Sequence, residues 1–342
     1  MRRLKFSLSL TAVIALLALV VGVAAARATS ASAGGSGGGN GGAAAGRRVD
    51  VIIKASNSSF WQTMLAGADA AQRDYGVVVS KFGPTSETDV GEQVNLVEGS
   101  IGRNVDAIVI APNSSTALDN VIDRARKAGI KVIVTDTQVT TTHDGFIGTD
   151  NEKAAEQAGR RMCELVAKAG KSTGNVLIES SVAGVQVLQD RERGFRTGMR
   201  ACPGLKISGP RFNGNDVNAA ANQVNDVITA DPNLVGVFGA NNTSGVGAAR
   251  AINDNKAGNR IAVVSFDTDP QQVAALANGS IDTLVVQNPY FFGYQGVLEA
   301  GASAAGTHAP PDLDPGAVLA DQANMNEPDI RELLIPPTSK AK

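Results

Sequence analysis

The stretch Asp106-Ala-Ile-Val-Ile-Ala-Pro-Asn113 indicates the fold class. It continues through a helical segment to Lys127-Ala-Gly-Ile-Lys-Val-Ile-Val-Thr-Asp136. Two apolar runs each end in a polar residue, and apolar positions at helical spacing lie between them. A second copy follows, in which Val235-Gly-Val-Phe-Gly-Ala-Asn241 leads through a helical segment to Lys256-Ala-Gly and Ile261-Ala-Val-Val-Ser-Phe-Asp267. The order strand, Asn, helix, Lys-Ala-Gly, strand, Asp therefore occurs twice and predicts two similar lobes.

Short apolar runs alternate with helical segments along most of the chain. The runs expected as strands are residues 49–55, 77–81, 106–111, 131–135, 175–180, 206–209, 235–239, 261–266, 283–286 and 317–320. Continuous apolar runs are typical of parallel strands that are buried on both faces. The alternation predicts an α/β fold with two Rossmann-like lobes, each built on a parallel sheet. Ligands of such sheets lie beyond the carboxyl ends of the strands, where Asn113, Asp136, Asn241 and Asp267 are expected to converge.

Length and composition narrow the class of protein. The 342 residues are enough for about two domains. Because 31 basic residues are balanced by 33 acidic ones without a basic block, a nucleic-acid partner is not expected. Two Cys and two His form no cluster with metal-ligand spacing, so neither a metal nor a cofactor is predicted.

The N-terminal segment has the layout of an export signal. Met1-Arg-Arg-Leu-Lys5 is basic, residues 8–24 are apolar, and Ala-x-Ala patterns follow, which predicts a signal peptide cleaved after Ala26 or Ala33. An uncleaved membrane anchor is the alternative. Residues 1–26 are thus assigned to the signal and 27–47 to a flexible Gly/Ser-rich linker, with the fold beginning near Arg48.

Export would place the protein in the periplasm or cell envelope, outside the cytoplasm. In an oxidising compartment, Cys163 and Cys202 can form a disulfide. Two separate buried thiols are the alternative.

Several ordered motifs resemble those of the type I periplasmic binding proteins, the ribose- and galactose-binding kind of ABC sugar importers. The motifs are Ser56-Asn57-Ser58-Ser59-Phe60-Trp61, Lys127 to Asp136, Arg191-Glu-Arg-Gly-Phe195, Val237 to Asn241, Val264-Ser-Phe-Asp267 and Val286-Gln287. The resemblance covers about residues 49–320. It implies two lobes joined by a hinge that close around a ligand, a Venus-flytrap arrangement.

The resemblance also implies which residues bind the ligand. Phe60 and Trp61 correspond to the aromatic pair against the sugar ring, and Asn57 to a neighbour of the site. The polar ligands implied are Asp136, Arg191, Asn241, Asp267 and Gln287. Five of these residues have a purely structural alternative: Trp61 as core, Asp136 and Asp267 as helix N-caps, Arg191 as a surface residue and Asn241 as a turn or cap.

These residue types suit a sugar. Each hydroxyl of a sugar both donates and accepts hydrogen bonds, and carboxylate, guanidinium and amide groups satisfy both roles. Aromatic faces cover the C–H patches of the ring. Two positions depart from the ribose-type pattern: Thr137 replaces an Arg, and Asn215 lies where an aromatic is expected, with Phe212 nearby. Both departures argue against ribose itself and leave a pentose, hexose, deoxysugar or polyol.

The resemblance places residues 48–149 and 288–316 in the N-terminal lobe and residues 150–287 and 317–336 in the C-terminal lobe. It implies a monomer that delivers its ligand to ABC permease subunits. A chemoreceptor or a sensor kinase is an alternative partner, and a non-sugar small molecule is an alternative ligand.

Enzymatic function is not expected. The chain lacks G-x-S-x-G, H-E-x-x-H and a G-x-G-x-x-G that opens a helix after a strand. Asp136 and Asp267 could mimic the two carboxylates of a glycosidase, but no acid/base context accompanies them. A transcriptional regulator shares the two-lobe fold, but an export signal occupies the place of its DNA-binding domain.

Overall fold

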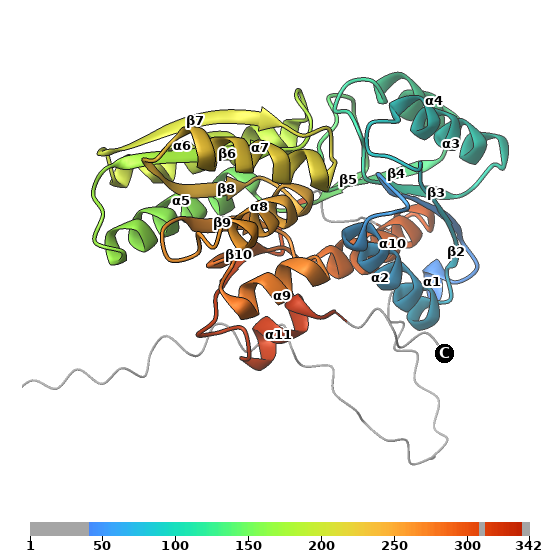
Figure 1. Ribbon diagram of the computed structural model, residues 1–342. Coiled ribbons are helices and arrows are strands. Elements are labelled where there is room, and N and C mark those ends of the chain that lie inside the picture. The colour runs from blue at the N-terminus through green and yellow to red at the C-terminus, as the bar shows by residue number, and fades with distance from the viewer. Residues whose placement is uncertain (1–40, 308–311, 337–342) are drawn as a thin grey trace, which may run out of the picture. The chain divides into compact units, whose positions relative to one another are not determined.

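A computed structural model describes residues 41–307 and 312–336, which form two six-stranded sheets with helices packed on them (Figure 1). The strand order is β11-β5-β4-β3-β1-β2 in the first sheet and β12-β10-β9-β8-β6-β7 in the second. The two-lobe α/β fold expected from the sequence is confirmed. None of the helices within the described residues is long and apolar enough to cross a membrane.

The strands of the first sheet are β1 (Arg48–Ile52), β2 (Val78–Phe82), β3 (Ala107–Ile110), β4 (Lys131–Thr135), β5 (Gly145–Ile147) and β11 (Asp312–Leu313). Those of the second are β6 (Gly174–Ser180), β7 (Leu205–Phe212), β8 (Leu234–Gly239), β9 (Ala262–Phe266), β10 (Thr283–Val286) and β12 (Val318–Ala320).

The helices are α1 (Gly41–Ala44), α2 (Ser59–Tyr75), α3 (Val90–Gly102), α4 (Asp119–Lys127), α5 (Asn151–Lys168), α6 (Gln186–Gly198), α7 (Val217–Ala230), α8 (Asn242–Asp254), α9 (Pro270–Asn278), α10 (Pro289–Ala304) and α11 (Pro328–Leu334). A 3₁₀ turn, η2 (Met199–Ala201), follows α6.

Both sheets are parallel except at one edge. The strand β12 pairs antiparallel with β10, whereas the other strand pairs of the described sheets are parallel, as expected from the apolar runs. The reason for the antiparallel pair lies in the route of the chain. The chain leaves β11 at the carboxyl edge of the first sheet and enters β12 directly. It therefore runs away from the edge at which the parallel strands end, because no crossover helix reverses it.

The chain passes between the two sheets three times, because β5 leads to α5, β10 leads to α10, and β11 leads to β12. Two of these segments, β5 and β11, were not expected as strands. They are three and two residues long. Runs this short carry no periodic signal, and each is defined by the neighbour that it pairs with.

Each sheet is buried on both faces. In β3, Val109 belongs to one apolar core, whereas Ile108 and Ile110 belong to the core on the opposite face. Successive side chains of a strand point to opposite faces, so this alternation follows directly from the apolar run in the sequence. The second sheet likewise separates two apolar clusters.

Helices α2 and α10 pack side by side on the first sheet and fix the approach to the carboxyl edge (Figure 1). A Cβ atom on Gly293 would collide with the carbonyl oxygen of Met64, and one on Gly67 with that of Tyr290. Only glycine permits this separation at the two contacts. The N-terminus of α2, which carries Phe60 and Trp61, is thereby held against the start of α10.

The folded part begins earlier than expected. Residues 41–44 form the helix α1, and Ala44 is fully buried in the core beside Val77. The assignment of all of residues 27–47 to a flexible linker is therefore wrong at its C-terminal end, because a small side chain can still fill a core position. The proposed signal peptide and the first part of the linker lie outside the described residues.

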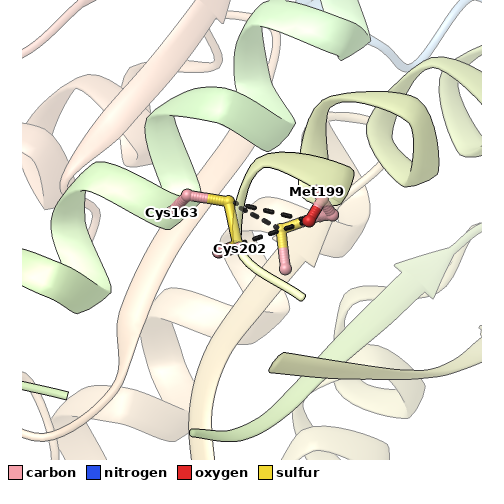
Figure 2. Close-up of a disulfide and its surroundings, with 3 residues drawn as sticks. All are labelled: Cys163, Met199 and Cys202. Atoms are coloured by element: carbon pink, nitrogen blue, oxygen red, sulfur yellow. Dashed lines mark hydrogen bonds between the residues drawn. A yellow bond between two sulfur atoms is a disulfide. The ribbon is translucent and has the colours of Figure 1, made fainter. Parts of the chain in front are cut away.

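One disulfide joins α5 to the turn after α6 (Figure 2). Its cysteines, Cys163 and Cys202, have Cα atoms 5.7 Å apart and are separated by 39 positions in the sequence. Figure 2 shows both sulfur atoms beside the carbonyl oxygen of Met199. The disulfide thus closes a loop that contains β6 and all of α6, the helix that carries Arg191.

Candidate ligand-binding cleft

A cavity of about 40 Å³ lies where strands of both sheets end. Charged, polar and apolar side chains share its wall. The lining residues are Lys54, Ser58, Phe60, Trp61, Glu87, Asn113, Asp136, Ser181, Val182, Val185, Val187, Leu188, Arg191, Asn241, Asn242, Asp267 and Gln287. The structure thus brings together seven of the eight residues expected at the site, from segments more than 200 residues apart.

A buried ion pair forms the floor on the side of the first sheet. Lys54 follows β1, and its Nζ lies 2.6 Å from Oδ2 of Asp136 and 2.6 Å from Oγ1 of Thr137. Lys54 and Asp136 are 4% and 5% exposed. The sequence lacks the Arg expected after Asp136, and the structure shows that Lys54 supplies a positive charge there from another strand.

The two aspartates at the strand ends have matching backbone geometry. Asp136 follows β4 with φ 61°, and Asp267 follows β9 with φ 76°. Their N–H groups donate to the carbonyl oxygens of Ile147 and Val285 on the neighbouring strands. Left-handed backbone is disfavoured for a residue with a side chain, and such residues cluster at functional sites. Neither residue is a helix N-cap, so that alternative is excluded.

Arg191 forms the opposite wall and is a buried residue, not a surface one. It is 3% exposed, its Nε donates to Oδ1 of Asn151, and its Nη1 donates to the carbonyl oxygen of Ala240. The guanidinium lies over the ring of Phe266, 4.1 Å from the centroid. These contacts hold the guanidinium with its Nη1 4.0 Å from Oδ2 of Asp267.

Asp267 is held at both oxygens. Gln287 donates from Nε2 to its Oδ1 at 2.6 Å, and the backbone N–H of Asn242 donates to its Oδ2 at 3.0 Å. Burial raises the pKa of the Asp267 carboxyl, and the neighbouring Arg191 opposes that shift. The carboxylate is therefore oriented by the protein before any ligand enters.

The aromatic pair lies at the start of α2. The rings of Phe60 and Trp61 meet edge to face with centroids 4.7 Å apart, and Nζ of Lys54 lies 5.4 Å from the Trp61 ring. Trp61 is 3% exposed and belongs to the apolar core, yet it also lines the cavity. The core interpretation of Trp61 therefore holds, and the ligand interpretation, with which its place in the cavity wall is compatible, stays a prediction.

Glu87 was not expected from the sequence. It lies in the loop between β2 and α3, and its Oε1 accepts a hydrogen bond of 2.7 Å from Nε1 of Trp61. Burial raises the pKa of the Glu87 carboxyl, while the positive charge of Lys54 lowers it.

Two buried acceptors in the wall have no partner among the described residues. They are Oδ1 of Asn113 and Oε1 of Gln287, whose residues are 5% and 2% exposed. A buried acceptor without a donor is unfavourable by about 1–3 kcal/mol. Their nitrogen atoms already bind the carbonyl oxygen of Lys54 and the carboxylate of Asp267. The oxygens therefore suit a ligand that brings hydrogen-bond donors.

Asn241 and Asn57 differ from the other expected residues. Asn241 lines the cavity, but it is the N-cap of α8, and its Nδ2 donates to Oδ1 of Asn215. Both ends of its amide are thus used by the protein. Asn57 is exposed and is not part of the wall, so its place at the site is corrected. It lies in the turn before α2, and its neighbour Ser58 lines the cavity instead.

Among the residues that the structure describes, the aromatic side chains that line the cavity are Phe60 and Trp61, and none comes from the second sheet. Phe212 is 45% exposed and is not part of the wall, and Asn215 has a left-handed backbone with φ 62°. Val182, Val185 and Leu188, from the loop before α6 and its first turn, supply apolar surface instead.

Lys54 and Glu87 line the cleft but were not expected there from the sequence, whereas Asn113 was expected to converge there with the other strand-end residues. Lys54 carried a signal, since a lysine interrupts an otherwise apolar strand end, and Asn113 was recognised only as a strand-end residue. No sequence signal marks Glu87, because its loop has no periodic pattern. In the two described ranges, no group of His, Cys, Asp and Glu could hold a metal ion.

Comparison with known proteins agrees with this geometry. Residues 49–308 match the family model described as "Periplasmic binding protein domain". The D-allose-binding periplasmic protein of Escherichia coli is 27% identical over 289 residues, covering 82% of this chain and 92% of that protein. The D-ribose/D-allose-binding protein of Pseudomonas aeruginosa is 30% identical, covering 64% and 70%.

Solved structures show the same fold. A carbohydrate transporter solute-binding protein from Agrobacterium radiobacter, in complex with D-arabinose, has a TM-score of 0.81 and 34% identity, covering 84% of this chain and 98% of that one. An ABC transporter solute-binding protein from Agrobacterium vitis with bound D-fucose has a TM-score of 0.79 and 31% identity, covering 84% and 99%. The chain therefore belongs to the periplasmic binding protein family, whose members bind solutes for ABC transporters and are not enzymes.

Proposed function

We propose that the protein binds one monosaccharide, a pentose, a hexose or a related polyol, in the cleft between its two lobes and delivers it to an ABC permease. The observation that supports this class of ligand is that one cavity wall carries both oriented charged groups and buried acceptor oxygens that have no partner among the described residues. Lys54, Asp136, Arg191 and Asp267 are fixed by protein contacts, while Asn113 and Gln287 keep an oxygen for the ligand.

The wall matches the two kinds of surface on a sugar. Hydroxyl groups can donate to the carboxylates and amide oxygens and accept from the cations. Phe60 and Trp61 on one side, with Val182 and Leu188 on the other, can cover the C–H surface. Relatives and neighbours named for allose, ribose, arabinose and fucose support this class of ligand.

Binding would act through lobe closure. We assign residues 48–149 and 288–316 to one lobe and 150–287 and 317–336 to the other, with the three chain crossings as the hinge. A ligand held by side chains from both lobes favours the closed state, because only that state offers all of the contacts. The closed form would then be presented to the permease.

A thermal-shift screen tests this proposal. Ligand-free protein is heated with D-allose, D-ribose, D-arabinose, D-xylose, D-fucose, D-galactose, D-glucose and a set of polyols. A ligand at one hundred times its Kd adds about 2.7 kcal/mol to the free energy of unfolding, which raises the Tm by several degrees. A rise with at least one sugar is expected. No rise with any of them, with folded protein shown to be ligand-free, contradicts the proposal.

A further inference from the structure

The charges of the cleft do not balance. Three carboxylates (Glu87, Asp136 and Asp267) line it, but only two cations (Lys54 and Arg191) do. The excess of one negative charge is a property of a partly enclosed cavity, where charges interact more strongly than at the surface.

Both cations are already engaged by the protein. Nζ of Lys54 contacts Asp136 and Thr137 at 2.6 Å each. Arg191 donates to Asn151 and to Ala240, and it lies beside Asp267. Both cations are therefore held in place by protein contacts, which use Nε and Nη1 of the Arg191 guanidinium and two of the three donors of the Lys54 ammonium.

Glu87 is the carboxylate without a cation of its own. Within the described ranges, its hydrogen-bond partner is the neutral indole N–H of Trp61. The charged groups that act on it are Lys54, from the end of β1, and Asp136 and Asp267, from the ends of β4 and β9. Lys54 attracts a negative charge and acts most strongly of the three, whereas Asp136 and Asp267 repel one.

We infer that Glu87 makes the cleft selective for uncharged sugars and against sugar acids. An anionic ligand would have to enter a cleft whose described wall carries one more carboxylate than cations, beside a Glu87 that is hydrogen-bonded to a neutral group. If Glu87 is ionised, the ligand is repelled. Because burial raises the pKa of Glu87, the alternative is proton uptake, and an acidic ligand would raise that pKa further. Both routes weaken the binding of a carboxylate ligand relative to a neutral one.

This inference rests on the proposed function and sharpens its ligand class. Glu87→Gln is the direct test, since the amide oxygen of Gln can still accept the hydrogen bond from Trp61 while the charge is removed. Glu98→Gln is the matched control, because Glu98 is an exposed residue of α3 that lies outside the cleft. It removes one charge from the same lobe at the surface.

The experiment measures Kd by calorimetry for two matched pairs, D-galactose with D-galacturonate and D-xylose with D-xylonate. The ratio of acid to neutral Kd is compared among wild type, Glu87→Gln and Glu98→Gln at low ionic strength. We expect Glu87→Gln to lower this ratio by about tenfold or more and Glu98→Gln to leave it unchanged. We also expect the wild-type ratio to fall as the pH is lowered, since protonated Glu87 no longer repels the acid.

The outcomes separate this inference from the proposed function. If no neutral sugar in these pairs or in the thermal-shift panel binds, the proposed function fails. If a neutral sugar binds but Glu87→Gln leaves the ratio unchanged, the role of Glu87 fails and the proposed function stands. Tighter binding of an acid than of its neutral partner by the wild type would also overturn the inference.

Discussion

Ser59 and Asp269 form a hydrogen bond across the cleft. Oγ of Ser59, the first residue of α2, donates to Oδ2 of Asp269 at 2.8 Å. Helix α2 packs on the first sheet, and Asp269 is the N-cap of α9 on the second. Neither residue is part of the cavity wall. The bond therefore joins the two lobes without using a residue of the cavity wall.

Ser59→Ala is expected to weaken sugar binding by about fivefold, because a net hydrogen bond of about 1 kcal/mol is lost from the closed state alone. The variant leaves the cap on α9 intact, since Asp269 still accepts from the N–H of Gln271. The dissociation rate measured by stopped flow should rise by a similar factor. Thr229→Ala serves as control, because it removes an exposed hydroxyl that bonds within α7. An unchanged dissociation rate in Ser59→Ala would show that the bond does not hold the cleft closed.

The ion pair of Lys54 and Asp136 predicts a stability effect. Lys54→Met should lower the free energy of unfolding by about 3 kcal/mol, because it leaves Asp136 buried without its cation. Adding Asp136→Asn should recover part of this loss. Lys81→Met, which breaks the surface pair with Asp69, should change stability by less than about 1 kcal/mol. Urea unfolding measures all of these variants, and equal losses for Lys54→Met and Lys81→Met would contradict the buried pair.

Glu179 predicts a pH dependence of stability. This residue of β6 is fully buried, its Oε2 has no partner among the described residues, and burial raises its pKa to about 7. Because the folded state binds this proton more tightly than the unfolded state, stability is present below pH 4.5 and is lost as the pH rises to about 7. The loss is of the order of 3 kcal/mol.

Glu179→Gln removes that titration and keeps an acceptor for the hydrogen bond from Asn213. Relative to wild type, the variant should gain stability between pH 5 and pH 7.5 in urea unfolding at several pH values. Glu192→Gln, at a surface pair with Arg196, is the control and should follow the wild-type curve. Parallel curves for wild type and Glu179→Gln would show that Glu179 does not titrate in this range.

The disulfide should contribute strongly to stability. The disulfide closes a loop between residues 39 positions apart. Replacing both Cys163 and Cys202 by Ser removes this constraint from the unfolded chain, which should lower the free energy of unfolding by about 4 kcal/mol. Guanidinium unfolding of the double variant against the wild type measures the loss. Reduction of the wild type should produce a similar loss, and the double variant should not respond to the reductant. A double variant as stable as the oxidised protein would contradict this prediction.

The sequence predicts the fold well where the signal is local. The strands Lys131–Thr135 and Thr283–Val286 have the expected bounds, because the apolar run that predicts each strand lies within the segment itself. The strands β5 and β11 could not be predicted, since two or three residues become a strand only through a neighbour distant in sequence.

The residues of the site were likewise predictable only where their signal lies within a local stretch of sequence. Asp136 and Asp267 are recognisable because they end apolar runs in a repeated pattern. The pairing of Lys54 with Asp136 spans 82 positions, and the bond from Trp61 to Glu87 depends on how a loop folds over α2. Such partners are decided by distances between segments, which a single sequence does not contain. Asn57 shows that a recognised motif does not fix the position of every side chain in it, because Asn57 is exposed to solvent.

We expect a monosaccharide to bind between Arg191, Asp136 and Asp267. Calorimetric titration of wild type and Asp267→Asn is the sharpest test of this site. Asp267→Asn keeps the shape of the side chain but removes the charge that the ligand and Arg191 share. Asp226→Asn, at an exposed position of α7 outside the cleft, is the matched control. We expect one sugar per wild-type or Asp226→Asn molecule and at least hundredfold weaker binding to Asp267→Asn. Equal affinity in all three proteins would contradict the assignment of this cleft as the binding site.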